Sequence, residues 1–319
     1  MSAPVDAGMR ALVFTNPGVV ELQDVPTPEV PSGWISLTVR ASGICGSELH
    51  GFRSLGFRRP PLIMGHEIAG ETPDGRRVVV NPLLSCGRCD MCARGAAELC
   101  RARGLMGVHL PGGFAEKVAV PREALQEIPD DLSWEEAVLI EPLANAVHAW
   151  RQVEHEPVER VAVIGAGTIG LVTLLVAGEQ GIGNVTVVDR APSRLALARR
   201  LGAAHCAPEL DGEYDVVVDA VGSAQTREAA LRCLRPGGTS LWLGLAEAGA
   251  GFDGNDLVRG EKRVVGSFAY SPDDFATAVA MAPHLDLAWA TAIPLEESQR
   301  TFMHLAEGAS DPVKAVIRL

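Results

Sequence analysis

The hydrophobic pattern divides the chain into regions of two kinds. Up to about residue 142, short apolar and β-branched runs, such as 35–39 and 77–80, alternate with proline and glycine. Short runs with this punctuation predict a compact β-barrel-like unit with few helices. The last fifty residues hold one helical pattern at 275–281 and one strand-like run at 313–317, which we assign to the same unit.

The middle region repeats a strand-then-helix pattern. The predicted strands are 161–164, 185–188, 216–218 and 239–243; the predicted helices follow the glycines after 164 and cover 194–201 and 227–234, and a turn is expected at 236–238. Such alternation predicts a parallel, doubly wound sheet with right-handed crossovers. The predicted fold is therefore α/β plus β, with boundaries at 1–142, 143–269 and 270–319.

One stretch, residues 161–178, runs without a charge for about the minimum length of a membrane span. Its four glycines divide it into a short strand, a turn and a buried helix, so we do not expect it to cross a membrane. The N-terminal residues MSAPVDAGMRALVF show no basic region followed by a sustained apolar run, which favours a cytoplasmic protein.

The composition and net charge limit the classes of molecule that the chain is expected to bind. The chain has 319 residues, 47% of them hydrophobic and 21% charged, as in ordinary globular proteins. Its formal net charge of −12 opposes binding to nucleic acid or to anionic membranes. A small-molecule substrate is the partner that we expect.

The first motif with chemical content is the GxGxxG of Gly165, Gly167 and Gly170. It follows a predicted strand, opens a helix and precedes Asp189 at the end of the next strand. These glycines allow a tight turn, an approach of the backbone to a pyrophosphate and close helix packing, respectively. Asp189 would accept hydrogen bonds from a ribose and disfavour a 2′-phosphate, which favours NAD, whereas Arg190 leaves NADP open.

The second motif is a cluster of four cysteines, Cys86, Cys89, Cys92 and Cys100. Four soft ligands at this spacing on one loop predict a zinc site, with an iron–sulfur cluster as the alternative. A closed shell of four thiolates has no open position for substrate, so this zinc would be structural.

The order of further motifs resembles the medium-chain zinc-dependent alcohol dehydrogenase family. ICGSELH at 44–50, GHE at 65–67, the cysteine loop, EPLANAVHA at 141–149 and VAVIGAGTIG at 161–170 carry the resemblance over nearly the whole chain. It is closest to the sorbitol and polyol branch, because Glu141-Pro142-Leu143 stands where other branches place a cysteine ligand. The resemblance implies a GroES-like catalytic domain, a Rossmann domain and two zinc ions per chain.

The resemblance also implies site residues. Cys45 and His66 would bind a catalytic zinc, and either Glu141 or Glu67 would complete or support the shell. Ser47 would pass the proton of the alcohol through the cofactor ribose towards His50. The remaining implied positions are Phe114 in the substrate pocket, Lys314 at the pyrophosphate, and Gly165, Gly167, Thr168, Ile169, Gly170, Asp189, Arg190, Arg194, Val221 and Leu243 at the cofactor.

Two departures from the family pattern bear on these expectations. The family often has Asp after the relay serine, and this chain has Glu48, which is one methylene longer. The chain is also shorter than typical members, so the loops around the substrate are expected to be trimmed.

The function implied is hydride transfer between NAD and a secondary alcohol, such as a polyol, a sugar alcohol or an amino-cyclitol. One alternative is an aldehyde, ketone or alkene reductase of the same fold that retains only the structural zinc. Another is a protein that binds NAD without turnover. The presence of Cys45, His66 and Ser47 argues against both, and a homodimer or homotetramer is expected from the resemblance.

Overall fold

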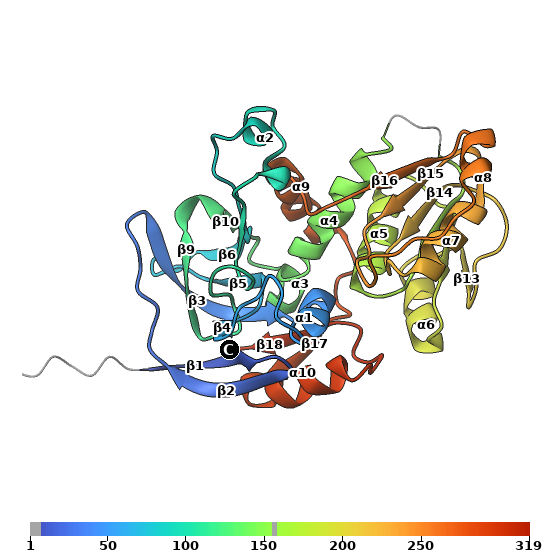
Figure 1. The fold of residues 1–319 in the computed structure, drawn as a ribbon. Helices are drawn as coiled ribbons and strands as arrows, with labels where there is room; N and C mark the ends of the chain where they lie inside the picture. Colours follow the sequence, from blue (N-terminus) through green and yellow to red (C-terminus); the bar gives the residue numbers. More distant parts are fainter. Residues whose placement is uncertain (1–7, 155–157) are drawn as a thin grey trace, which may run out of the picture. The chain divides into compact units, whose positions relative to one another are not determined.

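The computed structural model describes residues 8–154 and 158–319, which form two compact units (Figure 1). Unit 1 holds the described chain up to Glu141 together with Val279–Leu319, and unit 2 holds Pro142–Ala278. The chain therefore returns to unit 1 at Val279 rather than near residue 270. The expectation about the extreme N-terminus rests partly on residues 1–7, which lie outside the described residues.

Unit 1 is built from short strands around a barrel-like core. One sheet has the order β10-β6-β5-β3-β18-β17 with β9 also paired to β3, a second has the order β2-β1-β4, and β7 pairs with β8. Its strands are β1 Met9–Asn16, β2 Val19–Val25, β3 Trp34–Gly43, β4 Leu62–Ile63, β5 Glu67–Glu71, β6 Arg77–Val80, β7 Leu83–Leu84, β8 Gly104–Leu105, β9 Lys117–Pro121, β10 Leu125–Glu127, β17 Thr291–Pro294 and β18 Ala315–Arg318. Its helices are α1 Gly46–Gly51, α2 Asp90–Ala93, α3 Trp134–Ala137 and α10 Ser298–Ala306, with 3₁₀ turns at Ala97–Leu99, Arg122–Ala124, Ala282–His284 and Leu295–Glu297.

The strands predicted at 35–39 and 77–80 are confirmed within β3 and β6. In β3, the alternation of buried and half-buried residues directs Ile35, Leu37 and Val39 to one face, where they pack with Val78 and Val80 of β6. This period of two is the pattern of a strand with one face on a core.

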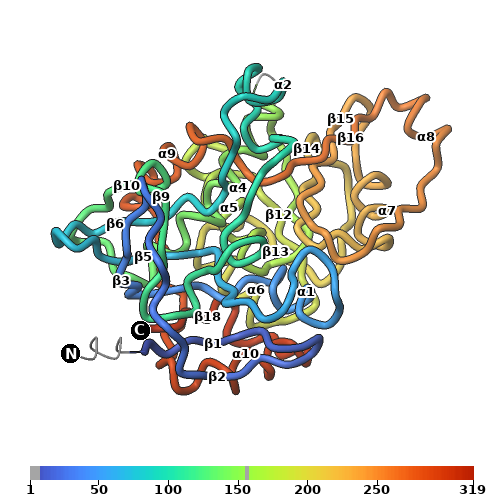
Figure 2. Tube along the Cα trace, turned by 60° about the vertical axis from the view of Figure 1, so that its left-hand side comes forward, coloured from blue at the N-terminus to red at the C-terminus, as the bar shows by residue number. Residues whose placement is uncertain are grey.

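The C-terminal segment completes unit 1. Strand β18 pairs antiparallel with β3, and its residues Ala315, Val316 and Ile317 are buried. Figures 1 and 2 both show α10 beside β1 and β2, although these elements are far apart in the sequence. Phe302 of α10 packs edge-on against Phe52, with ring centroids 5.1 Å apart. The return of the last segment to the first domain is thereby explained by buried apolar contacts.

Unit 2 is a parallel sheet of the order β13-β12-β11-β14-β15-β16, the order of a dinucleotide-binding Rossmann fold. Its strands are β11 Val161–Ile164, β12 Val185–Val188, β13 His205–Ala207, β14 Tyr214–Asp219, β15 Leu234–Trp242 and β16 Arg263–Gly266. Its helices are α5 Thr168–Glu179, α6 Pro192–Arg200, α7 Ala224–Arg232, α8 Gly254–Arg259 and α9 Pro272–Met281, and α4 Ile140–Arg151 leads into it from unit 1.

Most predicted elements of unit 2 are confirmed, but the turn at 236–238 is not a boundary. These residues lie inside β15, where the pairing with β14 jumps from Tyr214–Leu234 to Val216–Thr239. Proline and glycine therefore form a bulge within one strand.

Helix α5 is buried along most of its length, which explains its lack of charge. None of the helices in the described part of the chain combines the length and apolar character that a membrane crossing needs.

Candidate functional site

A possible metal site in unit 1 gathers Cys45, His66 and Glu67. One ligand atom from each lies within 4.8 Å of the others. Cys45 precedes α1, Glu67 begins β5 and His66 is its neighbour, so the starts of a helix and of a barrel strand bring them together. Glu67 is fully buried, and its Oε1 has no hydrogen-bond donor among the described residues. A thiolate, an imidazole and a buried carboxylate with an unsatisfied oxygen fit Zn²⁺.

Glu48 supports this group from behind. Its Oε1 accepts hydrogen bonds from His66 Nδ1 and from the amide of Gly65, each 2.9 Å long, and its Oε2 accepts one from the amide of Cys45 at 2.9 Å. Glu48, which is longer than the aspartate common in the family, thus also forms the capping box of α1. Because Nδ1 donates to Glu48, the other ring nitrogen of His66 is left for a metal.

Electrostatics agree with this arrangement. Burial acts to lower the pKa of His66, but the charges of Glu48 and Cys45 outweigh it and raise that pKa well above its ordinary value. Burial likewise acts to raise the pKa of Glu48, but His66 and Arg58 lower it overall. Glu48 and Cys45 therefore place negative charge around His66, which favours a cation at this position.

Lys314 lies in this site, which corrects the expectation that it meets the pyrophosphate. Its side chain is only 1% exposed, forms an ion pair with Glu67 Oε2 and donates a 3.1 Å hydrogen bond to the carbonyl of Ile44. The strand β18 that follows it pairs with β3 and thereby holds the ammonium beside the carboxylate. An ammonium buried in this way has no exposed surface to offer a cofactor phosphate.

The other carboxylate expected at the metal is Glu141. It is buried at the start of α4, but its oxygens are not among the ligand atoms grouped with Cys45 and His66. Phe114 is fully buried in the core of unit 1, and a Cβ at Gly65 would lie 2.5 Å from its ring. Phe114 therefore packs beneath the turn before His66, and its role in a substrate pocket stays a prediction.

The relay candidates lie on the opposite face of α1 from Glu48. Ser47 and His50 are three positions apart on this helix and are both exposed, whereas Glu48 is buried. The helix thus directs its acid inwards, towards His66, and its hydroxyl and second imidazole outwards.

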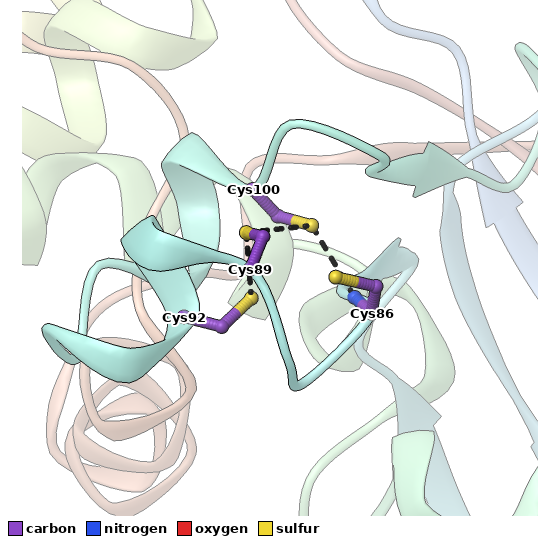
Figure 3. A group of neighbouring side chains, drawn as sticks. All are labelled: Cys86, Cys89, Cys92 and Cys100. Carbon is purple, nitrogen blue, oxygen red and sulfur yellow. Dashed lines mark hydrogen bonds between the residues drawn. The ribbon is translucent and has the colours of Figure 1, made fainter.

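The four remaining ligand candidates form a second group (Figure 3). The sulfurs of Cys86, Cys89, Cys92 and Cys100 lie within 4.8 Å of one another, with 3.5 Å from Cys89 to Cys92 and 3.9 Å from Cys89 to Cys100. Sulfurs of a tetrahedral zinc site with Zn–S bonds of about 2.3 Å lie about 3.8 Å apart. None of the four is in a disulfide.

Two thiols of this group have pKa values shifted in opposite directions. Hydrogen bonds from the amides of Cys92 and Arg101 lower the pKa of Cys89 to about 6. Desolvation and then the adjacent Cys89 raise the pKa of Cys92 to about 11. A cation between the four sulfurs would stabilise them as thiolates, and the residues fit a structural zinc.

In unit 2, the glycine turn has the geometry that the motif predicts. Gly165 has a φ of +96°, and a Cβ at Gly170 would lie 1.7 Å from the carbonyl oxygen of Gly165. Gly167 precedes the first turn of α5, and a Cβ added there would meet nothing within 4 Å. The turn is thus tight on its protein side and open where a pyrophosphate would approach.

Asp189 follows β12 and closes this turn. Its Oδ2 accepts a hydrogen bond from the amide of Ala166 and its Oδ1 one from Ala191, both 2.8 Å long. Each carboxylate oxygen retains a lone pair for a ribose hydroxyl. Arg194 lies 3.9 Å from Asp189, and Arg190 is exposed.

The remaining cofactor candidates share the same end of the sheet. Thr168 and Ile169 are half-buried in the first turn of α5, Val221 follows β14 and Leu243 follows β15. The amide of Leu243 donates a 3.0 Å hydrogen bond to the carbonyl of Asp219. The carboxyl ends of parallel strands are where ligands bind in doubly wound folds.

Sequence reasoning missed two cations near the metal group. They are Lys314, which pairs with Glu67, and Arg58, whose guanidinium contacts Ser47. In the sequence, Arg58 lies two residues before a proline and Lys314 just before the apolar run 315–317. The contacts of both side chains depend on long-range packing, which no local pattern shows.

Comparison with known proteins agrees with both units. The family models for the alcohol dehydrogenase GroES-like domain and for zinc-binding dehydrogenase match residues 31–130 and 168–283. The chain is 32% identical to sorbitol dehydrogenase of Bacillus subtilis, over 77% of each chain. It is 33% identical to L-threonine 3-dehydrogenase of a Chelativorans species, over 78% of this chain and 80% of the relative. Acetophenone reductase of Geotrichum candidum, solved in complex with NAD, is similar with a TM-score of 0.89 and 26% identity over 99% of both chains.

Proposed function

Because the chain belongs to the family of zinc-binding alcohol dehydrogenases with a GroES-like domain, we propose that it oxidises secondary alcohols of the polyol, sugar-alcohol or amino-cyclitol class with NAD. The observation that carries the proposal is the group of Cys45, His66 and Glu67, backed by Glu48. A reductase with only a structural zinc, or a protein that binds NAD without turnover, has no need of this group.

The residues of unit 1 have distinct roles in this proposal. When bound, zinc supplies a Lewis acid for the substrate oxygen and NAD supplies the hydride acceptor. Cys45 and His66 would hold the zinc, and Glu67 is favoured over Glu141 as the third group because its oxygen lies with theirs. Glu48 fixes the ring of His66 in the tautomer that such binding requires.

Proton transfer is assigned to α1. Ser47 would accept the proton of the substrate hydroxyl and pass its own towards His50, by way of the cofactor ribose. The hydroxyl can donate and accept at once, and imidazole titrates near neutral pH, which suits such a relay. The exposed positions of Ser47 and His50 support this assignment.

For the cofactor, we favour NAD over NADP. Asp189 would accept hydrogen bonds from the adenosine ribose, and its charge would repel a 2′-phosphate. Replacement of Asp189 by Ala should lower the preference for NAD over NADP, measured as the ratio of the two kcat/KM values. An unchanged ratio would show that Asp189 does not contact the ribose.

Assembly and location follow from the same proposal. A homodimer or homotetramer is expected from the resemblance to the family, and we propose a cytoplasmic location with it. Sedimentation of the purified chain would measure its assembly state.

The test of the function combines metal analysis with a substrate screen. Protein prepared without added metal should contain about two zinc per chain, and the Cys45→Ala variant about one. NADH formation would be screened over polyols, amino-cyclitols, simple secondary alcohols and L-threonine. Oxidation of polyols supports the proposal. Oxidation of L-threonine alone would contradict the substrate class, and about one zinc in the unmodified protein without any oxidation would contradict the reaction.

A further inference from the structure

Arg58 is a buried cation next to the proposed relay. Its residue is 7% exposed, and its guanidinium donates three hydrogen bonds. Nε donates to the carbonyl of Gly107 at 3.3 Å, Nη1 to the carbonyl of Ser47 at 3.0 Å, and Nη2 to the hydroxyl of Ser47 at 3.3 Å. One planar group thus binds both the backbone and the side chain of the residue that would move the proton.

The guanidinium of Arg58 packs against a glycine of α1. A Cβ at Gly51, on the last turn of α1, would lie 2.3 Å from Nη1, so a larger residue there would displace the guanidinium. Arg59, the next residue, is exposed. Of the two adjacent arginines, only Arg58 is therefore buried against α1.

We propose that Arg58 is a positioning residue for the proton relay, because it leaves the hydroxyl of Ser47 one lone pair to accept the substrate proton and one hydrogen to pass on. The inference rests on the proposed function, because it presupposes that Ser47 moves the substrate proton. A serine hydroxyl has one hydrogen and two lone pairs. Arg58 occupies one lone pair, and since a guanidinium has no acceptor, the hydrogen of Ser47 must point elsewhere.

The remaining lone pair and the hydrogen then match the two partners of a relay. As the O–H bond of the substrate breaks, its proton forms a bond to Ser47 Oγ, and the original proton of Ser47 leaves towards His50. No proton is gained or lost by Ser47. The fixed positive charge of Arg58 also disfavours any state in which Ser47 retains both protons.

The first test replaces Arg58 by Met, which preserves length and removes the charge. For alcohol oxidation under the conditions of the unmodified enzyme, we expect kcat to fall about 10- to 100-fold with KM changed less than about threefold, and zinc content to stay at two per chain. Arg58→Lys should recover part of kcat, because one ammonium can donate to Ser47 but lacks the planar fork. Arg59→Met is the matched control and should retain the kcat of the unmodified enzyme. An unchanged kcat in Arg58→Met would overturn the inference.

A double-mutant cycle with Ser47→Ala separates positioning from a structural role. If Arg58 acts through the hydroxyl, Arg58→Met should change kcat less than about twofold in the Ser47→Ala background. Equal losses in both backgrounds would overturn the inference. If Arg58→Met does not fold, Arg58→Lys takes its place in the cycle with the same criterion. If Ser47→Ala alone retains full turnover, the relay in the proposed function fails, whereas normal zinc content and hydride transfer would leave the dehydrogenase assignment intact.

Discussion

In the described part of the chain, each unit contains a histidine paired with a buried carboxylate. In unit 1, Glu48 accepts from His66 Nδ1 at 2.9 Å, and in unit 2, Asp274 accepts from His148 Nδ1 at 2.8 Å. The carboxylates are fully buried in both pairs. The pairs differ in what meets the second ring nitrogen.

The surroundings explain the difference. His66 shares its site with Cys45 and Glu67, two groups that can bind a metal. The Nε2 of His148 lies 3.2 Å from the side-chain amide of Gln152, and Asp274 also binds Ser271 and Arg151. The second pair therefore joins α4 to α9 within unit 2. A histidine with a carboxylate behind it indicates a metal site only when further ligands face its other nitrogen.

The largest expected effect separates the two histidines. His66→Ala should lower turnover more than about 1000-fold and remove about one zinc per chain, because it deletes a proposed ligand. His148→Ala should retain two zinc ions and most of the kcat. Metal analysis and steady-state kinetics on both variants make the comparison, and an active, zinc-replete His66→Ala would contradict it.

The next effect concerns stability in unit 2. Asp274→Asn should lower the free energy of unfolding by about 2–4 kcal/mol, because it weakens a buried carboxylate that accepts from His148, Ser271 and Arg151. Denaturant titration would measure the loss, and zinc content should not change. A variant of unmodified stability would show that the α4–α9 junction does not depend on this charge.

A smaller effect is expected behind the metal. Glu48→Gln retains the shape of the side chain but weakens its hold on His66, so zinc affinity should fall about 10- to 100-fold. Competition with a chelator would measure the affinity of the more labile zinc. Asp274→Asn serves as the control, and equal affinities in the two variants would mean that Glu48 does not support the metal.

The smallest effect is a pH dependence. Burial acts to raise the pKa of Asp274, but its bonds to His148, Ser271 and Arg151 outweigh it and hold that pKa below the ordinary value. As pH falls, the carboxylate of Asp274 takes up a proton near pH 4 in the unfolded chain, before it does so in the folded chain. The stabilisation by the ionised carboxylate is therefore complete above about pH 5, and it is lost as pH falls towards the lower pKa of the folded state. Unfolding measured from pH 6 to pH 3 should show a shallower loss in Asp274→Asn, and identical slopes would count against the pairing.

The sequence predicted the parts of this molecule that depend on local pattern. The strands Val161–Ile164 and Val185–Val188 have the predicted bounds, because fully buried strands in a parallel sheet are short apolar runs between glycine and polar residues. The bulge in β15 was mistaken for a turn, since proline and glycine favour both.

The site was predictable to the extent that motifs define it. Cys45, His66 and the four-cysteine loop follow from residue type and spacing, and the structure brings each group together. The reach of Glu48, the pairing of Lys314 and the contact of Arg58 with Ser47 depend on side-chain length and on strands joined across the sequence. No local pattern contains that information.

The return of the C-terminal strand has a consequence for biosynthesis. Lys314 and β18 complete the surroundings of Glu67, yet all of unit 2 is translated between these two parts of unit 1. A ribosome must therefore release residues 314–318 before the barrel near Gly43 can close, while unit 2 can fold as soon as it emerges. Nascent chains would have a finished nucleotide domain while the catalytic barrel is still open, so the surroundings of Glu67 are completed only after unit 2 has been made.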